Sequence, residues 1–207
     1  MLPHTDIDIE IPKKAGVLLL SGTMIFPHSL MDLLIFEPRY RKMLSDVLEG
    51  DWMFCIGDLT SEEEPALENC TSEVGTLVLV NASRTLDNGR SSLVVSGLHP
   101  VRFDSWDTTL EYPCAEISQI QRIPLSSQDG ESVKALIVDI LPNSMDALTD
   151  SLKEVIISNL SEMKCYSALI DCVAQNFVSD SDLRRELLCE IDDKVRASKL
   201  IASLSSS

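Results

Sequence analysis

Apolar residues in the first part of the chain fall in short runs with the spacing of β-strands. These runs occupy residues 17–20, 30–36, 52–57, 74–83, 91–97, 100–106 and 114–122. The run at 30–36 is apolar along most of its length, which predicts burial on both of its faces. The residues at 87–89 read Asp-Asn-Gly, a strong β-hairpin signal between two of the runs. Six or seven short strands predict a mostly antiparallel sheet that curls or closes into a barrel.

A single helical pattern interrupts these strands. Pro38 suits the first turn of a helix, where its missing N–H is not needed. The apolar residues that follow are spaced at i, i+3, i+4, i+7 and i+8, and they are Tyr40, Met43, Leu44, Val47 and Leu48. Gly50 is expected to end this helix in the left-handed conformation. The residues between 60 and 72 include three consecutive glutamates, Glu62 to Glu64, and are expected to form an exposed acidic loop.

After about residue 128 the apolar spacing becomes helical and stays so to the end. It predicts five helices, at 131–141, 146–163, 166–175, near 181–188 and at 193–204. Ser179 or Ser181 is expected to cap the fourth. Residues 124–130 are rich in turn formers and suit a linker. The pattern therefore predicts an α+β protein, with a β-barrel unit over 1–124 and a helical bundle over 125–207.

Charge narrows the range of partners. The chain carries 17 basic and 33 acidic residues, a formal net charge of −16. A phosphate backbone or an anionic membrane needs a basic surface, so we expect neither nucleic acid nor membrane as a partner. No apolar run approaches the roughly 20 residues that span a bilayer. The acidic N-terminus does not resemble a secretory signal, and the six cysteines lack C-x-x-C spacing. We expect a cytoplasmic protein whose thiols are reduced and mostly buried.

A search for chemistry yields little. The three histidines, His4, His28 and His99, have no cysteine or histidine at zinc-ligand spacing. Acidic pairs such as Asp6/Asp8 and Asp192/Asp193 are more typical of a solvated surface than of a metal site. No phosphate-binding glycine loop is present. Ser161 and Lys164 match the S-x-x-K motif of some acyl-transfer enzymes, but the partner motifs of those enzymes are missing. We predict no catalytic residue, no metal or nucleotide site and no cofactor.

Several segments resemble one family. Ile25-Phe26-Pro27 followed by the residues 33–43, Leu-Leu-Ile-Phe-Glu-Pro-Arg-Tyr-Arg-Lys-Met, resembles the opening of the Lon protease N-terminal, substrate-binding domain. The resemblance is nearest to the stand-alone bacterial proteins of that family. Further matches follow in order at 73–76, 94–103, 112–117 and 187–196. Together they cover residues 15–204, nearly the whole chain.

The resemblance implies a PUA-like β-barrel followed by a helical bundle. In full Lon proteases this region binds unfolded or damaged substrates, and an ATPase module and a Ser–Lys protease module follow it. Cereblon carries a related domain that also acts by binding. The resemblance therefore implies a non-catalytic module whose partners are unfolded proteins or peptides. A second expected partner is a AAA+ protease, for which the chain would act as an adaptor.

The loop at 22–28 is the first candidate for peptide contact, because large apolar residues in a loop need either burial or a partner. Its candidate contact residues are Met24, Ile25, Phe26 and Pro27, and Arg39 and Tyr40 at the helix start complete the set. One alternative is that the loop plugs the end of the barrel, while Arg39 pairs with Glu37 and fixes the helix start. Another is a hydrolase or peptidase with an unrecognised site, for example at Ser161.

Overall fold

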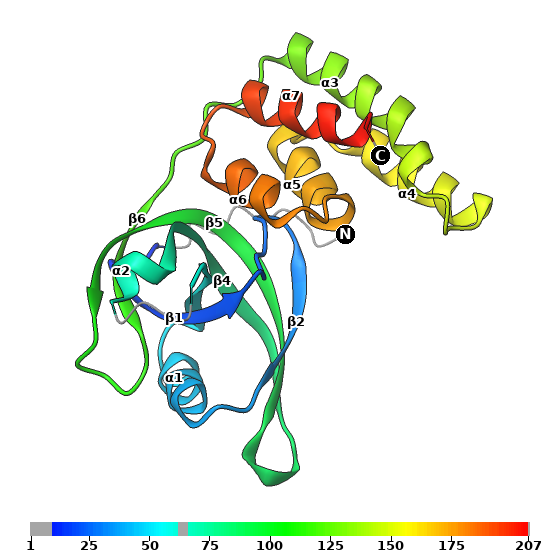
Figure 1. Cartoon of the computed structure of the whole chain (residues 1–207). Coiled ribbons are helices and arrows are strands. Elements are labelled where there is room, and N and C mark those ends of the chain that lie inside the picture. The colour runs from blue at the N-terminus through cyan, green and yellow to red at the C-terminus, as the bar shows by residue number, and fades with distance from the viewer. Residues whose placement is uncertain (1–9, 62–65, 207) are drawn as a thin grey trace.

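The computed structural model describes residues 10–61 and 66–206. A curled β-sheet forms one unit and a helical bundle stacks against its end (Figure 1). The predicted α+β order is confirmed, with the sheet first and the bundle second. The strands are β1 (Lys14–Ser21), β2 (Leu30–Ile35), β3 (Met53–Leu59), β4 (Thr71–Thr85), β5 (Ser91–Asp107) and β6 (Cys114–Gln119). His4, the Asp6/Asp8 pair and Glu62 to Glu64 lie outside the described residues.

The sheet closes on itself. Its strand order is β2-β5-β4-β3-β1-β6, and β5 also pairs with β6. Five strands therefore form a closed ring, while β2 pairs with β5 alone. The expectation of a mostly antiparallel sheet holds with one correction, because β1 and β3 are parallel. Parallel neighbours need a crossover, and β2 together with α1 (Pro38–Glu49) supplies it.

Strands β4 and β5 form one long hairpin. Asn88 and Gly89 both have positive φ angles, 66° and 74°, as the predicted turn requires. The two strands expected at 91–97 and 100–106 are in fact one strand. A register shift around Leu98 absorbs an extra residue, so the strand bends and continues through Pro100 instead of ending.

Helix α1 begins at Pro38 and buries the predicted stripe, with Leu48 partly buried at its end. The expectation for Gly50 was wrong. Its φ angle is −105°, and the left-handed residue is Trp52, with a φ of 64°. The N–H groups of Gly50 and Trp52 both donate to the carbonyl of Val47, at 3.1 Å each. The chain therefore reverses two residues later than the glycine indicates.

Strand β2 does not have two buried faces. Its side chains alternate, so that Ile35 is buried while Leu30 and Leu34 are 57% and 49% exposed. Phe36, directly after the strand, is 58% exposed. The outward face of a barrel strand meets water unless another element covers it, and no described element covers that face of β2. A continuous apolar run in the sequence does not show that one face of the strand is exposed.

The bundle contains α3 (Ser127–Ile140), α4 (Asp150–Glu162), α5 (Tyr166–Phe177), α6 (Ser181–Cys189) and α7 (Asp193–Leu204). Side-chain oxygens of Ser126, Asp180 and Asp192 cap α3, α6 and α7. The cap of α6 is thus Asp180, not Ser179 or Ser181, because its carboxylate accepts from the Leu183 N–H at 2.7 Å. The expected acidic loop at 60–72 contains a short helix, α2 (Leu67–Cys70), and the first residues of β4.

The connection between barrel and bundle is held in place. The Ile123 N–H donates to the Ile191 carbonyl at 2.8 Å, and the Asp193 N–H donates to the Ile123 carbonyl at 3.1 Å. The Arg122 guanidinium donates to the Leu188 carbonyl at 2.9 Å. The two residues directly before the predicted linker at 124–130 are therefore bonded to the bundle, and α3 begins within that linker.

Six cysteines are free thiols. Cys55, Cys70 and Cys114 are buried, as predicted, and burial raises the pKa of the Cys55 thiol. Cys165 and Cys189 are exposed and Cys172 is half-buried. Within residues 10–61 and 66–206, no helix has the length and apolarity needed to cross a membrane.

Candidate polypeptide-binding site

The loop between β1 and β2 is packed between the two units. Met24, Ile25 and Phe26 are 4%, 1% and 0% exposed, and Pro27 is buried. Ile25 belongs to the core of the barrel, whereas Phe26 belongs to the core of the bundle. These four candidate contact residues thus lie in the interior. The loop is packed, which matches the alternative interpretation, and its four apolar residues therefore have a structural role in this conformation.

Polar groups from both units bind the backbone of this loop. The Thr76 hydroxyl on β4 donates to the Ile25 carbonyl at 2.6 Å. From the bundle, Gln175 Oε1 accepts from the Phe26 N–H at 2.9 Å, and Arg184 donates to the Met24 carbonyl at 2.8 Å. The guanidinium of Arg184 also lies 5.4 Å from the centre of the Phe26 ring.

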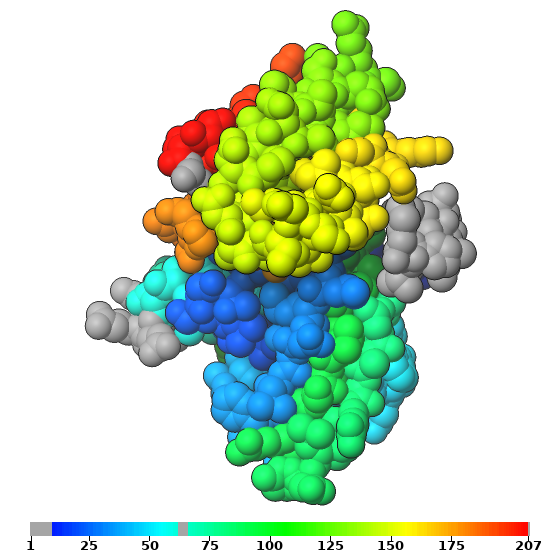
Figure 2. Space-filling model, turned by 90° about the vertical axis from the view of Figure 1, so that its right-hand side faces the viewer, coloured from blue at the N-terminus to red at the C-terminus, as the bar shows by residue number. Residues whose placement is uncertain are grey.

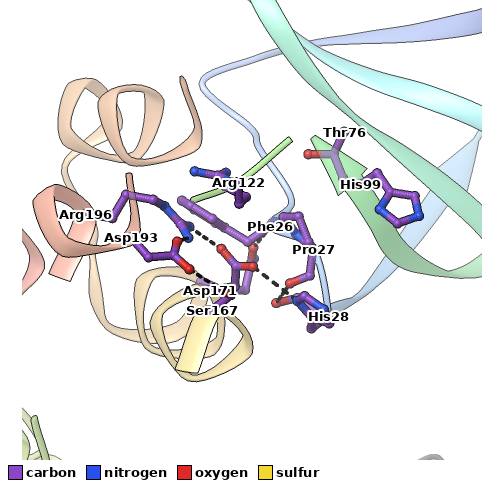
Figure 3. Close-up of polar contacts among 12 residues, drawn as sticks. Phe26, Pro27, His28, Thr76, His99, Arg122, Ser167, Asp171, Asp193 and Arg196 are labelled. Carbon is purple, nitrogen blue, oxygen red and sulfur yellow. Dashed lines mark hydrogen bonds and ion pairs between the residues drawn. The ribbon is translucent and has the colours of Figure 1, made fainter. Parts of the chain in front are cut away.

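A buried charge network continues from the loop into the bundle (Figure 3). His28 Nδ1 lies 3.1 Å from Asp171 Oδ2, and Asp171 Oδ1 pairs with the guanidinium of Arg196. Arg196 is fully buried and also pairs with Asp193 at 2.8 Å. Asp193 in turn accepts a hydrogen bond from Ser167. Among the described residues no hydroxyl or thiol bonds to His28, so the network lacks the contact between nucleophile and base that covalent catalysis uses.

Tyr40 and Arg39 lie at the edge of the barrel. The Tyr40 ring is buried, and burial raises the pKa of its hydroxyl. That hydroxyl lies 3.3 Å from the Leu19 nitrogen and 3.5 Å from the Leu19 carbonyl oxygen. It therefore occupies the place where a neighbouring strand would bind β1. Arg39 pairs with Glu37 at 2.9 Å and stacks 4.5 Å from the Tyr40 ring, which is the pairing that the alternative interpretation predicted.

An apolar groove runs beside the free edge of β2. Its floor is formed by the buried side chains Leu18, Ile35 and Tyr40. Leu20, Leu33, Leu34 and Phe36 complete its apolar lining, and Glu37 is its one charged lining residue. The groove encloses about 50 Å³, which accepts the tip of a side chain but not a whole small molecule. Among the described residues β6 pairs with β1 only over 14–16, so β2 presents an open edge on this side, while the Tyr40 hydroxyl covers the edge of β1 at Leu19.

Two larger cavities lie elsewhere. One, of about 360 Å³, is lined by Glu68, Glu73, Arg102 and Asp104 together with Phe103 and Trp106. The other, of about 300 Å³, is lined by Glu186, Glu190 and Lys199 among others. Charged walls hold water and do not favour an apolar ligand. Of these three recesses, the groove beside β2 is the one suited to apolar side chains.

The remaining chemical candidates are scattered. The Ser161 hydroxyl donates back to the Ile157 carbonyl of its own helix at 2.7 Å, and Lys164 lies beyond the end of α4. Asp192 caps α7 and Asp193 pairs with Arg196. Within the described ranges, no three histidine, cysteine, aspartate or glutamate side chains are grouped as metal ligands would be.

Sequence reasoning missed the exposed side chains of β2, although the chain contains one signal for them. Leu30, Asp32, Leu34 and Phe36 share a face at the two-residue period of a strand. A charged residue on that face indicates that it meets water. The two-residue period therefore predicts the exposure of the β2 side chains better than the continuous apolar run does.

Comparisons with known proteins agree with this architecture. The computed fold resembles the N-terminal domain of the Mycobacterium avium complex Lon protease, with a TM-score of 0.74, 16% identity, and coverage of 94% of this chain and 99% of that chain. It also resembles a Lon N-terminal domain protein from Xanthomonas campestris, with a TM-score of 0.62, 16% identity, and coverage of 91% and 97%.

Sequence comparison points to the same group. The chain is 21% identical over 211 residues to a Lon protease of Desulfosudis oleivorans (strain DSM 6200 / JCM 39069 / Hxd3). The match covers 95% of this chain and 24% of that protein, so the chain spans about a quarter of the length of this curated relative. The family model for the ATP-dependent protease La (LON) substrate-binding domain matches residues 15–206. The chain belongs to the LON substrate-binding domain family.

Proposed function

We propose that this protein binds extended, apolar polypeptide segments along the free edge of β2 and in the groove beside it. The observation that carries the proposal is the set of three large apolar side chains, Leu30, Leu34 and Phe36, exposed at a strand edge that has no neighbour among the described residues. Such an edge can accept an added strand, whose main chain supplies hydrogen bonds and whose side chains fill the groove. The family supports the same role, since its description is of substrate binding.

The free edge of β2 has few of the features that prevent another strand from pairing with it. Natural edge strands usually carry several charges, prolines or bulges that prevent pairing with another chain. Between its first and last residues, β2 contains one charged side chain, Asp32, and no proline. Its pairing with β5 is regular over six residues, so the opposite edge is straight enough to accept a strand of similar length.

The expected ligands are unfolded proteins or peptides in the cytoplasm, since a folded protein rarely offers an extended apolar segment. The curated relative is named a Lon protease, and it is about four times as long as the matched region. We propose that the bound segment is passed to an ATP-dependent AAA+ protease. Binding alone is assigned to the residues described above, and no step of chemistry is assigned to them.

The test is a titration followed by fluorescence anisotropy. The ligand is a labelled, uncharged ten-residue peptide rich in leucine and valine, and a matched peptide carries N-methyl groups on alternate residues. Replacing Leu34 and Phe36 together by serine should weaken binding at least about tenfold, because two exposed apolar contacts of roughly 1 kcal/mol each are lost. N-methylation should weaken it as well, because it removes main-chain donors.

The matched control is Leu152→Ser with Val155→Ser on α4, where the side chains are 46% and 53% exposed. This variant removes comparable apolar surface from residues that do not line the groove and should bind normally. Equal losses in the two double variants, or equal binding of the N-methylated peptide, would contradict the proposed site.

A further inference from the structure

The side chains of three arginines at one end of the molecule have no partner among the residues that the structure describes. The chain has nine arginines. Six of them bond to carboxylates or carbonyls, and these are Arg39, Arg102, Arg122, Arg184, Arg185 and Arg196. The side chains of the other three, Arg41, Arg84 and Arg90, make no hydrogen bond or ion pair with any described residue. Both hairpin arginines, Arg84 and Arg90, are exposed.

All three of these arginines border one turn, and we call them the arginine end. Arg84 and Arg90 flank the turn of the β4–β5 hairpin, which Figure 1 shows projecting below α1. Arg41 reaches that turn from α1, and its guanidinium packs so closely on Gly89 that a Cβ there would have no room. Positive charges that are not paired with a carboxylate favour an anion at this end of the molecule.

The arginine end adjoins the proposed binding edge. Leu34 of β2 pairs with Ser92 of β5, and Ser92 pairs with Arg84 of β4, so the three side chains share one face of the sheet. Two strand spacings, or about 10 Å, separate the backbones of Leu34 and Arg84, and a strand added at the free edge of β2 would lie one spacing farther from Arg84. In Figure 2 the β2 segment (blue) lies on the face toward the viewer, with α1 (light blue) and the hairpin (green) below it.

The carboxylates near the arginine end do not fully neutralise its positive charge. Glu37 is already paired with Arg39. Asp32 lies at the next outward position along β2, opposite Val94, and so is farther from the turn than Leu34. Asp87 lies in the turn itself and forms no ion pair with a described residue. The chain as a whole is strongly acidic, with a net charge of −16, so an unpaired basic cluster is a local exception.

We propose that the arginine end recognises acidic side chains that flank an apolar segment bound along β2. This inference rests on the proposed function and adds the class of substrate to it: about six apolar residues followed or preceded by two or three aspartates or glutamates. Arginine suits this role because its planar fork can bind a carboxylate through two hydrogen bonds. Screening limits the interaction to about 8 Å at physiological salt, so the local arginines, not the distant acidic surface, determine the preference.

Peptides with one apolar core and different flanks test the inference. The six-residue core is flanked on either side by three glutamates, three glutamines or three lysines, and anisotropy is measured at low salt. The glutamate peptide should bind about tenfold more tightly than the glutamine peptide, since each exposed charge pair contributes a modest amount. The lysine peptide should bind more weakly than both. The advantage should disappear at about 0.5 M salt, where charges are screened beyond roughly 4 Å.

Charge-reversal variants locate the effect. Arg84→Glu with Arg90→Glu should abolish the advantage of the glutamate peptide and leave binding of the glutamine peptide unchanged. The control, Lys13→Glu with Lys164→Glu, makes the same change in net charge at two exposed lysines away from the hairpin and should keep the advantage. If the control variant loses it equally, the arginine end is not the site and the inference is wrong.

The outcomes separate the two proposals. Equal binding of all three peptides would overturn the acidic preference while the edge of β2 remains a binding site. Absence of binding by every peptide would overturn both. Tighter binding of a single-stranded oligonucleotide than of the glutamate peptide, with the same dependence on Arg84 and Arg90, would assign the arginine end to phosphates and contradict a polypeptide ligand.

Discussion

Asp171 Oδ2 lies 3.1 Å from His28 Nδ1, and the other oxygen of the same carboxylate pairs with Arg196. One buried side chain thus joins the loop that leaves the barrel to the charged core of the bundle. The loop also supplies Phe26 to the apolar core of the bundle. Barrel and bundle are therefore connected by side chains as well as by the chain that runs through Arg122.

Replacing Asp171 by alanine should destabilise the protein by about 3 kcal/mol, because Arg196 would keep a buried charge with one of its two carboxylates removed. Urea unfolding at neutral pH measures the difference. The control is Asp182→Ala, which breaks an ion pair whose aspartate side chain is 87% exposed and should cost less than about 1 kcal/mol. Similar losses in both variants would show that the network does not stabilise the fold.

Phe26→Ala should cost about 3–5 kcal/mol, since the ring is fully buried and its removal leaves a cavity in the core of the bundle. Phe36→Ala should cost less than about 1 kcal/mol, because that ring is 58% exposed. Thermal unfolding of the two variants gives the comparison. A small loss of stability in Phe26→Ala would mean that the loop is not packed as described. The loop would then again be a candidate for peptide contact at the surface.

Gly97→Ala should be strongly destabilising, by about 2 kcal/mol or more, because a Cβ at this position would collide with the carbonyl of Phe26. Backbone atoms on both sides leave the clash no easy relief. Ser92→Ala is the control on the same strand. Ser92 is exposed, already carries a Cβ, and makes no side-chain hydrogen bond with a described residue. Chemical unfolding should show little change for the control, and equal stability of both variants would refute the clash.

Stability should fall in mild acid. Burial, and then the charge of His28, lower the pKa of His99 below its usual 6.5. The unfolded chain therefore takes up a proton before the folded protein does, so the contribution is complete above about pH 6.5 and is lost as the pH falls through the folded pKa. Urea midpoints between about pH 7.5 and 5 should decrease, and the decrease should be smaller in His99→Gln. An identical pH profile in that variant would exclude His99 as the cause.

Features that depend on a few neighbouring residues could be predicted from the sequence. The proline at the start of α1, its apolar stripe and the Asp-Asn-Gly turn each act over a few residues, so their effects do not depend on the rest of the fold. Two predictions failed where backbone hydrogen bonding, and not the residue pattern, decides the course of the chain. Gly50 is not left-handed because the carbonyl of Val47 accepts from both Gly50 and Trp52. The strand through Pro100 continues because its pairing with β4 accommodates the extra residue Leu98.

In the candidate site, too, the sequence predicted some features, whereas contacts between distant residues decided the others. The sequence indicated that the apolar loop at 22–28 needs burial or a partner, but not which of the two, because the answer depends on whether Gln175, Arg184 and the core of the bundle lie beside it. It placed Arg39 and Tyr40 correctly at the start of α1. It did not reveal that the Tyr40 hydroxyl covers the open edge of β1, since that contact joins residues 21 positions apart.

By itself, then, the sequence determined most of the helices and strands, the order of barrel and bundle, the acidic character and the family. The tertiary structure alone decided that β2 lies at the end of the sheet, that its outward apolar side chains face water and that three arginines whose side chains have no partner among the described residues border the β4–β5 turn. The physical reason is that periodicity records which residues prefer burial, whereas exposure and charge pairing depend on which segments become neighbours in space.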